Sequence, residues 1–304
     1  MTRPASKRVT PADAVAPDRP RFGFTDRELA EAPTVFRADL MKDQVVLISG
    51  GSSGMGRAMA FLFARLGAQV VICGRRAEKL HTVAKAIAKL GGREVDVRSM
   101  TIRDPEAVDT LIDHTFRTHG RLDCLINNAG GQFPQDAIDF SRKGWNAVID
   151  LNLNGTWWMM QAAAQRWRDR NQGGNIINIV ANVDRGMPQA AHTCAARAGV
   201  IYLSKTVSTE WAPLNVRVNC IAPGTIETEG FAVYPDHALE RFHQANPMMT
   251  LGDAWDVAEA AVYFAAPSAK FITGEVLTID GGMQQWGVVW PAGMPDYFKV
   301  GGGA

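Results

Sequence analysis

Residues 44–68 read "QVVLISGGSSGMGRAMAFLFARLGA", and this stretch decides the fold class of the chain. Residues 45–48 are a continuous run of valine, leucine and isoleucine, which is typical of a strand buried on both faces. A turn with glycines at positions 50, 54 and 56 follows, and the apolar residues after it recur at the period of a helix. The stretch therefore predicts a strand, a tight turn and a helix, the repeating unit of a parallel α/β sheet.

The same alternation of strand and helix continues along the rest of the 304 residues. Further strands are predicted at 69–73, 94–102, 122–127, 175–180, 216–221 and 276–280. Helices are predicted at 57–68, 75–92, 104–120, 143–169 and 188–211. Because crossovers between parallel strands are right-handed, this order predicts one doubly wound Rossmann domain of the α/β class, with helices on both faces of the sheet, over residues 41–284.

Two segments flank the predicted domain. Residues 1–40 are polar and rich in proline, and we expect an N-terminal extension that is partly disordered. Within it, Thr25 and Glu28 have the spacing of a capping box and predict a short helix. The C-terminal tail, residues 285–304, carries four aromatic side chains: Trp286, Trp290, Tyr297 and Phe298. Because exposed aromatic groups usually need a surface to cover, we expect the tail to lie on a neighbouring subunit or over the cleft.

Charge and composition exclude several classes of protein. The formal net charge is +1, from 32 basic and 31 acidic residues, which does not favour nucleic acid or an anionic membrane as a partner. No apolar run is long enough to span a bilayer, and residues 1–20 lack the apolar core of a secretion signal, so a cytoplasmic protein is predicted. The four cysteines show no CxxC spacing and predict buried reduced thiols, with neither disulfides nor a metal site. They are Cys73, Cys124, Cys194 and Cys220.

The glycine turn predicts a nucleotide site. Glycine allows positive φ and lets the backbone approach a pyrophosphate, and the following helix offers free N–H groups and a positive dipole end. Tight turns without a ligand also use glycine, but the strand, loop and helix context favours the nucleotide. The predicted contacts from this turn are Gly50, Ser52, Ser53, Gly54 and Met55.

The end of the second strand predicts which cofactor is bound. An acidic residue here would accept hydrogen bonds from the adenosine ribose of NAD, but the sequence places Arg75 and Arg76 after Gly74. A guanidinium pairs with a phosphate on that ribose, so NADP(H) is predicted, with Arg75 as the main phosphate partner. The alternative is a solvated arginine pair at the start of a helix.

Further motifs resemble the short-chain dehydrogenase/reductase family over residues 42–282. They are "NNAG" at 127–130, "LNLNG" at 151–155, "NCIAPGTIET" at 219–228 and "FITGEVLTIDGG" at 271–282. The resemblance implies that Asn128, Ala129 and Gly130 line the adenosine and ribose side of the cofactor. It implies contacts with the nicotinamide end from Pro223, Gly224, Ile226 and Thr228, and a catalytic place for Asn152. Thr101 departs from the aspartate that contacts the adenine in many members.

Segments that flank the substrate cleft are similar to a narrower group within this family. "NNAGGQF" at 127–133, "SRKGWNAVIDLNLNGT" at 141–156 and "AAHTCAARAGV" at 190–200 resemble peroxisomal trans-2-enoyl-CoA reductases and, next, 2,4-dienoyl-CoA reductases. The resemblance implies an acyl-CoA substrate and a homo-oligomer, a dimer or tetramer, formed through the helices at 143–169 and 188–211.

The chain lacks the proton-transfer residues that this family usually carries. The family places a serine after the strand at 175–180 and Tyr-x-x-x-Lys on the next helix, where this chain has Thr193 and Arg197 and no serine. Tyr202 does not replace the tyrosine, because it lies nine residues after Thr193, about 13 Å further along the helix axis, and it is interpreted as a packing residue. Of the other tyrosines, Tyr234 lies in the segment that the family uses as a substrate lid.

Conjugate reduction remains possible without the tyrosine. Hydride added to an enoyl thioester leaves negative charge on the thioester oxygen, which needs hydrogen-bond donors rather than an acid. Arg197 is a permanent cation with several donors, and His192, Thr193 and Asn182 are candidates for others. Water or His192 would protonate the α-carbon.

Blander roles compete with each of these assignments. The resemblance implies that Arg197 holds the ribose hydroxyls of the cofactor, as the family lysine does, and this could be its only role. His192 could only cap or pack the helix, and Thr193 could have no role. The competing functions are a carbonyl reductase or alcohol dehydrogenase with a different proton relay, and a catalytically silent NADP-binding oligomer.

Overall fold

The centre of the protein is one sheet of seven parallel strands in the order β3-β2-β1-β4-β5-β6-β9. A computed structural model describes residues 21–234 and 236–286 of the chain. The strands are β1 Val45–Ser49, β2 Gln69–Gly74, β3 Asp96–Ser99, β4 Cys124–Asn127, β5 Gly174–Ile179, β6 Val216–Pro223 and β9 Val276–Ile279. Every residue of β1 and β4 is buried, which explains their unbroken apolar sequences.

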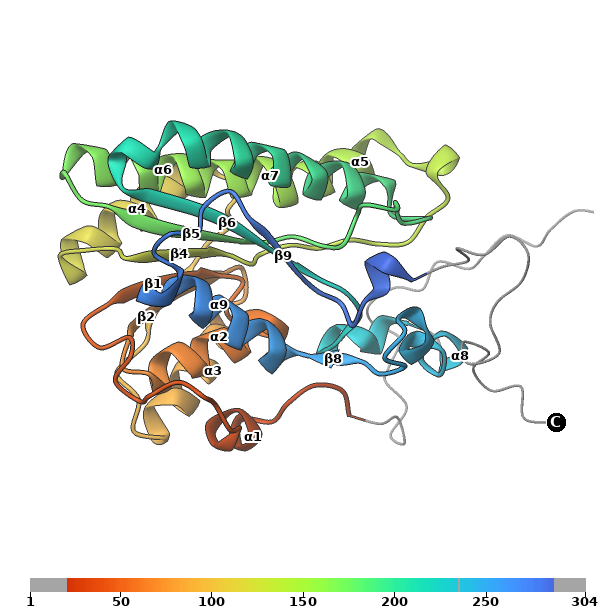
Figure 1. The fold of residues 1–304 in the computed structure, drawn as a ribbon, viewed down its shortest axis with the longest axis horizontal. Helices are drawn as coiled ribbons and strands as arrows, with labels where there is room; N and C mark the ends of the chain where they lie inside the picture. Colours follow the sequence, from red (N-terminus) through yellow and green to blue (C-terminus); the bar gives the residue numbers. More distant parts are fainter. Residues whose placement is uncertain (1–20, 235, 287–304) are drawn as a thin grey trace, which may run out of the picture.

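Helices cover both faces of the sheet, as Figure 1 shows. One face carries α2 Gly54–Arg65, α3 Ala77–Lys89 and α9 Ala254–Ala265; the other carries α4 Pro105–His119, α5 Arg142–Ile149, α6 Gly155–Asp169 and α7 Ala191–Glu210. Each face has its own apolar core. Phe61 of α2 and Phe264 of α9 belong to one, and Phe116 of α4 and Trp167 of α6 belong to the other. The predicted doubly wound α/β fold is confirmed.

The order of the strands reverses between β1 and β4. β1 pairs with β2 on one side and with β4 on the other, so the loops that leave β1 and β4 diverge toward opposite faces. In doubly wound sheets the ligand lies at the carboxyl ends of the strands where this reversal occurs. The fold therefore brings the glycine turn after Ser49 next to the residues after Asn127.

The predicted helix at 143–169 is interrupted by a π-helix, Asp150–Asn154, between α5 and α6. The wide turn carries Asn152, which is 1% exposed. Its side chain accepts a hydrogen bond from Gly131 N and donates one to Gly131 O, both at 3.0 Å. Hydrophobic periodicity cannot reveal such a turn, because a π-turn is a change in backbone hydrogen bonding.

The part of the N-terminal extension that the structure describes, residues 21–40, is packed on the domain. It contains α1 Asp26–Glu31, with the predicted capping box between Thr25 and Glu28. Leu29 is 1% exposed, and Arg65 of α2 donates to Leu29 O and Ala32 O. Residues 1–20 lie outside the described part, so the expectation of a partly disordered extension stays a prediction.

A lid segment, defined as residues 229–234 and 236–242, stands beside the carboxyl end of the sheet. It contains a 3-10 helix, Glu229–Val233, and α8 Asp236–Leu239. The lid segment lies between β7 Ile226–Glu227 and β8 Gly252–Asp253, two short strands that pair in parallel. No helix among the described residues combines the length and the hydropathy needed to cross a membrane.

The expected docking of the tail lies mostly outside the described residues. Of its four aromatic side chains, Trp290, Tyr297 and Phe298 belong to the undescribed range 287–304.

Candidate active site

The turn between β1 and α2 needs glycine for its backbone geometry. Gly50 has a φ of +70° and Gly54 a φ of +52°, a region that other residues rarely adopt. At Gly56 an added Cβ would lie 2.3 Å from Gly50 O, so the first turn of α2 packs directly on the loop. At these three positions the turn therefore carries no side chain of its own over its backbone N–H groups.

Asn128 and Ser49 hold this turn in place. The Asn128 side chain donates to Ser49 O at 3.1 Å and to Gly50 O at 3.2 Å. In return, Ser49 Oγ accepts hydrogen bonds from Asn128 N at 3.1 Å and Ala129 N at 3.0 Å. Asn128 thus positions the glycine turn from the neighbouring strand.

A cleft of about 310 Å³ opens at the reversal point, between this turn and the loop after β4. Eleven of the predicted cofactor residues line it: Gly50, Ser52, Ser53, Gly54, Met55, Arg75, Arg76, Asn128, Ala129, Gly130 and Thr228. Thr101, the departure from the family aspartate, also lines it. Pro223, Gly224 and Ile226 are not among the lining residues, and Gly224 is packed against Asp280, 2.6 Å from where its Cβ would lie.

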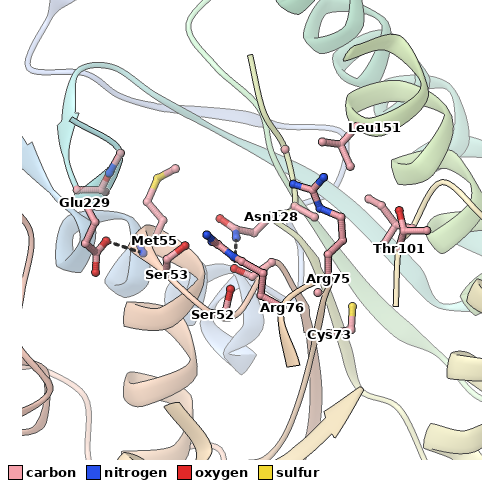
Figure 2. A pocket seen from close by; sticks show the side chains of 18 of the residues that line it. Ser52, Ser53, Met55, Cys73, Arg75, Arg76, Thr101, Asn128, Leu151 and Glu229 are labelled. Atoms are coloured by element: carbon pink, nitrogen blue, oxygen red, sulfur yellow. Dashed lines mark hydrogen bonds between the residues drawn. The ribbon is translucent and has the colours of Figure 1, made fainter. Parts of the chain in front are cut away.

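Arg75 and Arg76 provide the positive charge of the cleft. Both side chains are exposed and extend across it from the end of β2, as Figure 2 shows. Within the described ranges, neither guanidinium forms a hydrogen bond or an ion pair with the protein. Because all their donors are open, the two arginines suit an anionic ligand group.

Arg197 lies at the inner end of the site and is buried. It is 8% exposed, and its Nη1 donates to Ile179 O at 3.0 Å. Burial lowers the pKa of Arg197 from its ordinary value to about 10. No acidic side chain among residues 21–234 and 236–286 pairs with it. Its Nη2 lies 2.1 Å from where a Cβ of Gly130 would be, so glycine at that position leaves room for the guanidinium.

Thr193 lies one helical turn before Arg197, on the same face of α7. It is 3% exposed, and its Oγ1 is buried without a hydrogen-bond partner in the described part of the chain. A buried hydroxyl without a partner is unfavourable, so this position would accommodate a ligand oxygen or a water as its partner.

His192 is fully buried beside the aromatic rings of Phe133 and Phe140, at 4.7 and 4.4 Å between ring centroids. Its Nδ1 accepts a hydrogen bond from Thr193 N at 2.8 Å, which places the ring proton on Nε2. Burial lowers the pKa of His192, so the imidazole is neutral at physiological pH. A neutral imidazole is a very weak acid, so this geometry does not favour the predicted role of His192 as a proton donor to carbon, which stays a prediction.

Asn182 is a predicted hydrogen-bond donor to the thioester oxygen, but its side chain is bonded elsewhere in the protein. Its Nδ2 donates to Asp280 Oδ2 at 2.6 Å, and its backbone N donates to Pro223 O at 3.2 Å. The side chain thus ties the end of β5 to the loop after β9. Asn152, whose amide is committed to Gly131, likewise positions the loop after β4.

The described tyrosines do not complete the site. Tyr202 is 70% exposed, so its interpretation as a packing residue is wrong within one chain. Tyr234 lies in the lid segment, where its ring contacts Phe231 and Phe242 at 6.4 and 5.2 Å between centroids.

Glu229 is the main residue of the cleft that the sequence did not reveal. Its Oε2 accepts a hydrogen bond from Gly54 N at 2.9 Å, and its Oε1 pairs with Arg57 Nη1 at 2.7 Å. The only sequence feature that marks it is an acidic residue directly after the motif that ends at Thr228. Met100, Ile102 and Leu151 are apolar lining residues that were also missed.

A second polar cluster lies at the sheet edge, at the opposite end of the strands. Asp96, which begins β3, accepts from His114 at 2.7 Å and from His119 at 3.1 Å, and these three side chains could hold a metal ion. Arg98 also contacts both Asp96 and His114, so the carboxylate charge is matched without an ion. Burial raises the pKa of Asp96, but the bonds from the two histidines and the charge of Arg98 outweigh it and lower that pKa overall.

Comparison with known proteins identifies relatives over most of the chain. A family model described as enoyl-(acyl carrier protein) reductase matches residues 50–284. A Bacillus subtilis (strain 168) protein named probable 2,4-dienoyl-CoA reductase is 39% identical over 251 residues, which cover 81% of this chain and 98% of that protein. The peroxisomal 2,4-dienoyl-CoA reductase of Pongo abelii is 35% identical over 254 residues, 82% of this chain and 86% of that protein. Among solved structures, the citronellol catabolism dehydrogenase of Pseudomonas aeruginosa PAO1 matches with a TM-score of 0.74 at 35% identity, covering 83% of this chain and 99% of that one.

Proposed function

Because the chain belongs to the short-chain dehydrogenase/reductase family, we propose that it reduces the conjugated double bond of an α,β-unsaturated acyl-CoA. Membership of the family makes the protein an oxidoreductase with a nicotinamide cofactor. Two relatives named 2,4-dienoyl-CoA reductase support the acyl-CoA substrate, since each is at least 35% identical over more than four fifths of this chain.

The residues of the cleft fit NADP(H) as this cofactor. The glycine turn places no side chain of its own over the start of α2, and the N–H groups there suit a diphosphate. Arg75 and Arg76 stand where an acidic residue would favour NAD, and neither has an internal partner in the part described. Both observations support a phosphate on the adenosine ribose, with Arg75 as its main partner.

The observation that carries the proposed reaction is Arg197, a buried cation without a carboxylate partner in the described residues. A buried charge is unfavourable unless it is paired, so an anion from the ligand would complete the site. A bound nicotinamide cofactor supplies hydride, and its addition to the β-carbon of an enoyl thioester places negative charge on the thioester oxygen. Arg197 would stabilise this charge, and the free hydroxyl of Thr193 would add a second donor.

The α-carbon would then take its proton from water. His192 remains neutral, and its position between aromatic rings suits packing and, through Nε2, donation to an oxygen. Arg197 keeps its proton throughout, because even its lowered pKa of about 10 lies well above physiological pH.

Carbonyl reduction is the competing function, and the site is poorly equipped for it. A ketone oxygen needs a proton as hydride arrives, and losing a positioned general acid typically costs about 10²–10⁴-fold in rate. Thr193 cannot supply that proton as a phenol does, and Tyr202 points to solvent on the same helix.

The test compares two substrate panels with NADPH. We expect kcat/KM for trans-2-enoyl-CoA and 2,4-dienoyl-CoA to exceed that for matched ketones and 3-oxoacyl thioesters by about 100-fold or more. Loss of NADPH absorbance gives the rates, and mass spectrometry of the acyl products identifies the reduced bond. Faster reduction of ketones contradicts the proposal, and tight NADPH binding without turnover on either panel indicates a silent binding protein.

We propose further that the enzyme acts in the cytoplasm as a homo-oligomer. The buried, unpaired thiols of Cys73, Cys124 and Cys220 support a reducing compartment. Exposed aromatic side chains on the helices expected at the interface, Tyr202 of α7 and Trp145 of α5, support self-association. Light scattering of the purified protein checks the assembly.

A further inference from the structure

A carboxylate occupies the backbone amide at the start of α2. Glu229 Oε2 accepts a hydrogen bond from Gly54 N at 2.9 Å, although the two residues lie 175 positions apart in the sequence. Figure 2 shows this bond as a dashed line beside Ser53 and Met55. Gly54 is the first residue of α2, so its N–H is one of the free donors at a helix N-terminus, where the helix dipole attracts an anion.

The same N–H is a donor that the diphosphate of a dinucleotide needs. In Rossmann-type sites the diphosphate lies at the N-terminus of the helix after the glycine turn, and in this chain that helix is α2. A carboxylate and a diphosphate repel each other, and they cannot both take this donor. We infer that Glu229 is a residue of the cofactor site that holds the Gly54 amide in the free enzyme and competes with the cofactor diphosphate for it. The inference rests on the nicotinamide-cofactor site of the proposed function.

The surroundings of Glu229 allow its side chain to leave Gly54 N without disturbing the glycine turn. Its side chain is 39% exposed, so it can rotate toward solvent. Its partner Arg57 is only 14% exposed and also pairs with Asp26 Oδ1 at 2.7 Å, so Asp26 keeps the guanidinium in place when Glu229 moves. The Arg57 donor that Glu229 releases then adds a positive charge next to the diphosphate position.

Displacement of Glu229 from Gly54 N by the diphosphate would also affect the lid segment and the N-terminal extension. Gly23 N donates to Glu227 Oε1 at 3.3 Å, and a Cβ at Gly23 would lie 3.3 Å from the carboxyl carbon of Glu229. The ring of Phe22 contacts that of Phe231 at 5.9 Å between centroids. Because the extension packs over the first turn of the lid, displacement of Glu229 should loosen both segments.

The test is Glu229→Gln, which keeps the shape and an acceptor for Gly54 N but removes the charge. We expect the Kd of the full-length protein for NADP⁺, from a fluorescence titration, to fall by about tenfold. Stopped-flow measurement should show slower release of NADPH, because the variant competes less well for the vacated amide. Hydrogen exchange in α1 and the lid should rise on NADP⁺ binding in the wild-type protein.

Two controls isolate the effect. Asp26→Asn removes the other ion pair of Arg57 but does not touch Gly54 N, and we expect no tighter binding of NADP⁺. Adenosine 2′-monophosphate lacks the diphosphate, so its Kd should be the same for wild type and Glu229→Gln. An unchanged or raised Kd for NADP⁺ in Glu229→Gln overturns the inference, as does equal tightening by Asp26→Asn. If wild type binds neither NADP⁺ nor NAD⁺, the cofactor site of the proposed function fails instead.

Discussion

Replacing Arg197 by methionine should make the free protein more stable and the enzyme much slower. Burial lowers the pKa of Arg197 from its ordinary value to about 10. At about 1.4 kcal/mol per pKa unit, the buried charge destabilises the folded state by roughly 3 kcal/mol at neutral pH. The variant loses the hydrogen bond to Ile179 O, which contributes about 1 kcal/mol. The free energy of unfolding without ligand should therefore rise by about 2 kcal/mol.

Activity should change in the opposite direction. Removing a donor to a developing oxyanion typically lowers kcat by about 10²–10³-fold. Urea denaturation of the ligand-free proteins at one protein concentration gives the stability difference, and kcat/KM for an enoyl-CoA gives the activity. Arg197→Lys is the matched control, because it keeps the charge and lacks the planar fork of donors. It should keep part of the activity and gain no stability.

The two readouts refute different parts of the reasoning. If Arg197→Met destabilises the free protein by more than about 1 kcal/mol, the guanidinium has a structural role larger than one hydrogen bond. If kcat/KM stays within about threefold of wild type, Arg197 does not stabilise the oxyanion in the reaction.

Three further changes test the site and the fold. In a binding titration, Arg75→Ala should weaken NADPH binding by roughly ten- to a hundredfold and leave NADH binding unchanged, because a charge-assisted hydrogen bond contributes about 1.5–3 kcal/mol. Equal weakening of NADPH and NADH binding argues against the NADP assignment. Thr193→Tyr combined with Arg197→Lys should raise kcat/KM for a ketone and lower it for an enoyl-CoA, because the phenol supplies an acid and crowds a buried position; unchanged enoyl-CoA activity places Thr193 away from the substrate. Asp96→Asn should lower stability by about 1 kcal/mol at neutral pH. Because the pKa of Asp96 is lowered in the folded protein, its carboxylate contributes fully to the free energy of unfolding above the ordinary pKa of 3.8. This contribution is lost as the pH falls through the lowered pKa, so the urea curves of the wild type and Asp96→Asn should converge in acid.

The fold and the family followed from local sequence. The buried strands β1 and β4 are unbroken apolar runs, and the glycine turn after β1 needs a backbone that only glycine adopts easily. An unbroken apolar run predicts a buried strand and a glycine permits a positive φ, so a short stretch of sequence is enough to predict both. The predicted resemblance to the short-chain dehydrogenase/reductase family is confirmed for the same reason, because its motifs are local.

The details of the site depended on partners far apart in the chain. Asn182 is drawn to Asp280, 98 positions away, and Glu229 reaches Gly54 across 175 positions. Neither contact leaves a periodic or compositional trace. The neutral state of His192 likewise follows from its burial and from the amide beside it, which sequence spacing does not report.

The π-turn at Asp150–Asn154 also sets the phase between two helices. A π-turn amounts to one residue inserted into an α-helix, and one residue corresponds to a rotation of about 100° around the helix axis. α5 lies against α7, whereas α6 lies against α4. Because of the inserted residue, the nearly continuous helical segment from α5 to α6 directs apolar residues toward both α7 and α4. Deleting a single residue here would restore an ordinary helix, yet it would turn the buried Met159 and Ala163 of α6 away from the sheet. The helical segment from α5 to α6 therefore does not tolerate the loss of even one residue at the π-turn, although its two ends lie in solvent-facing loops.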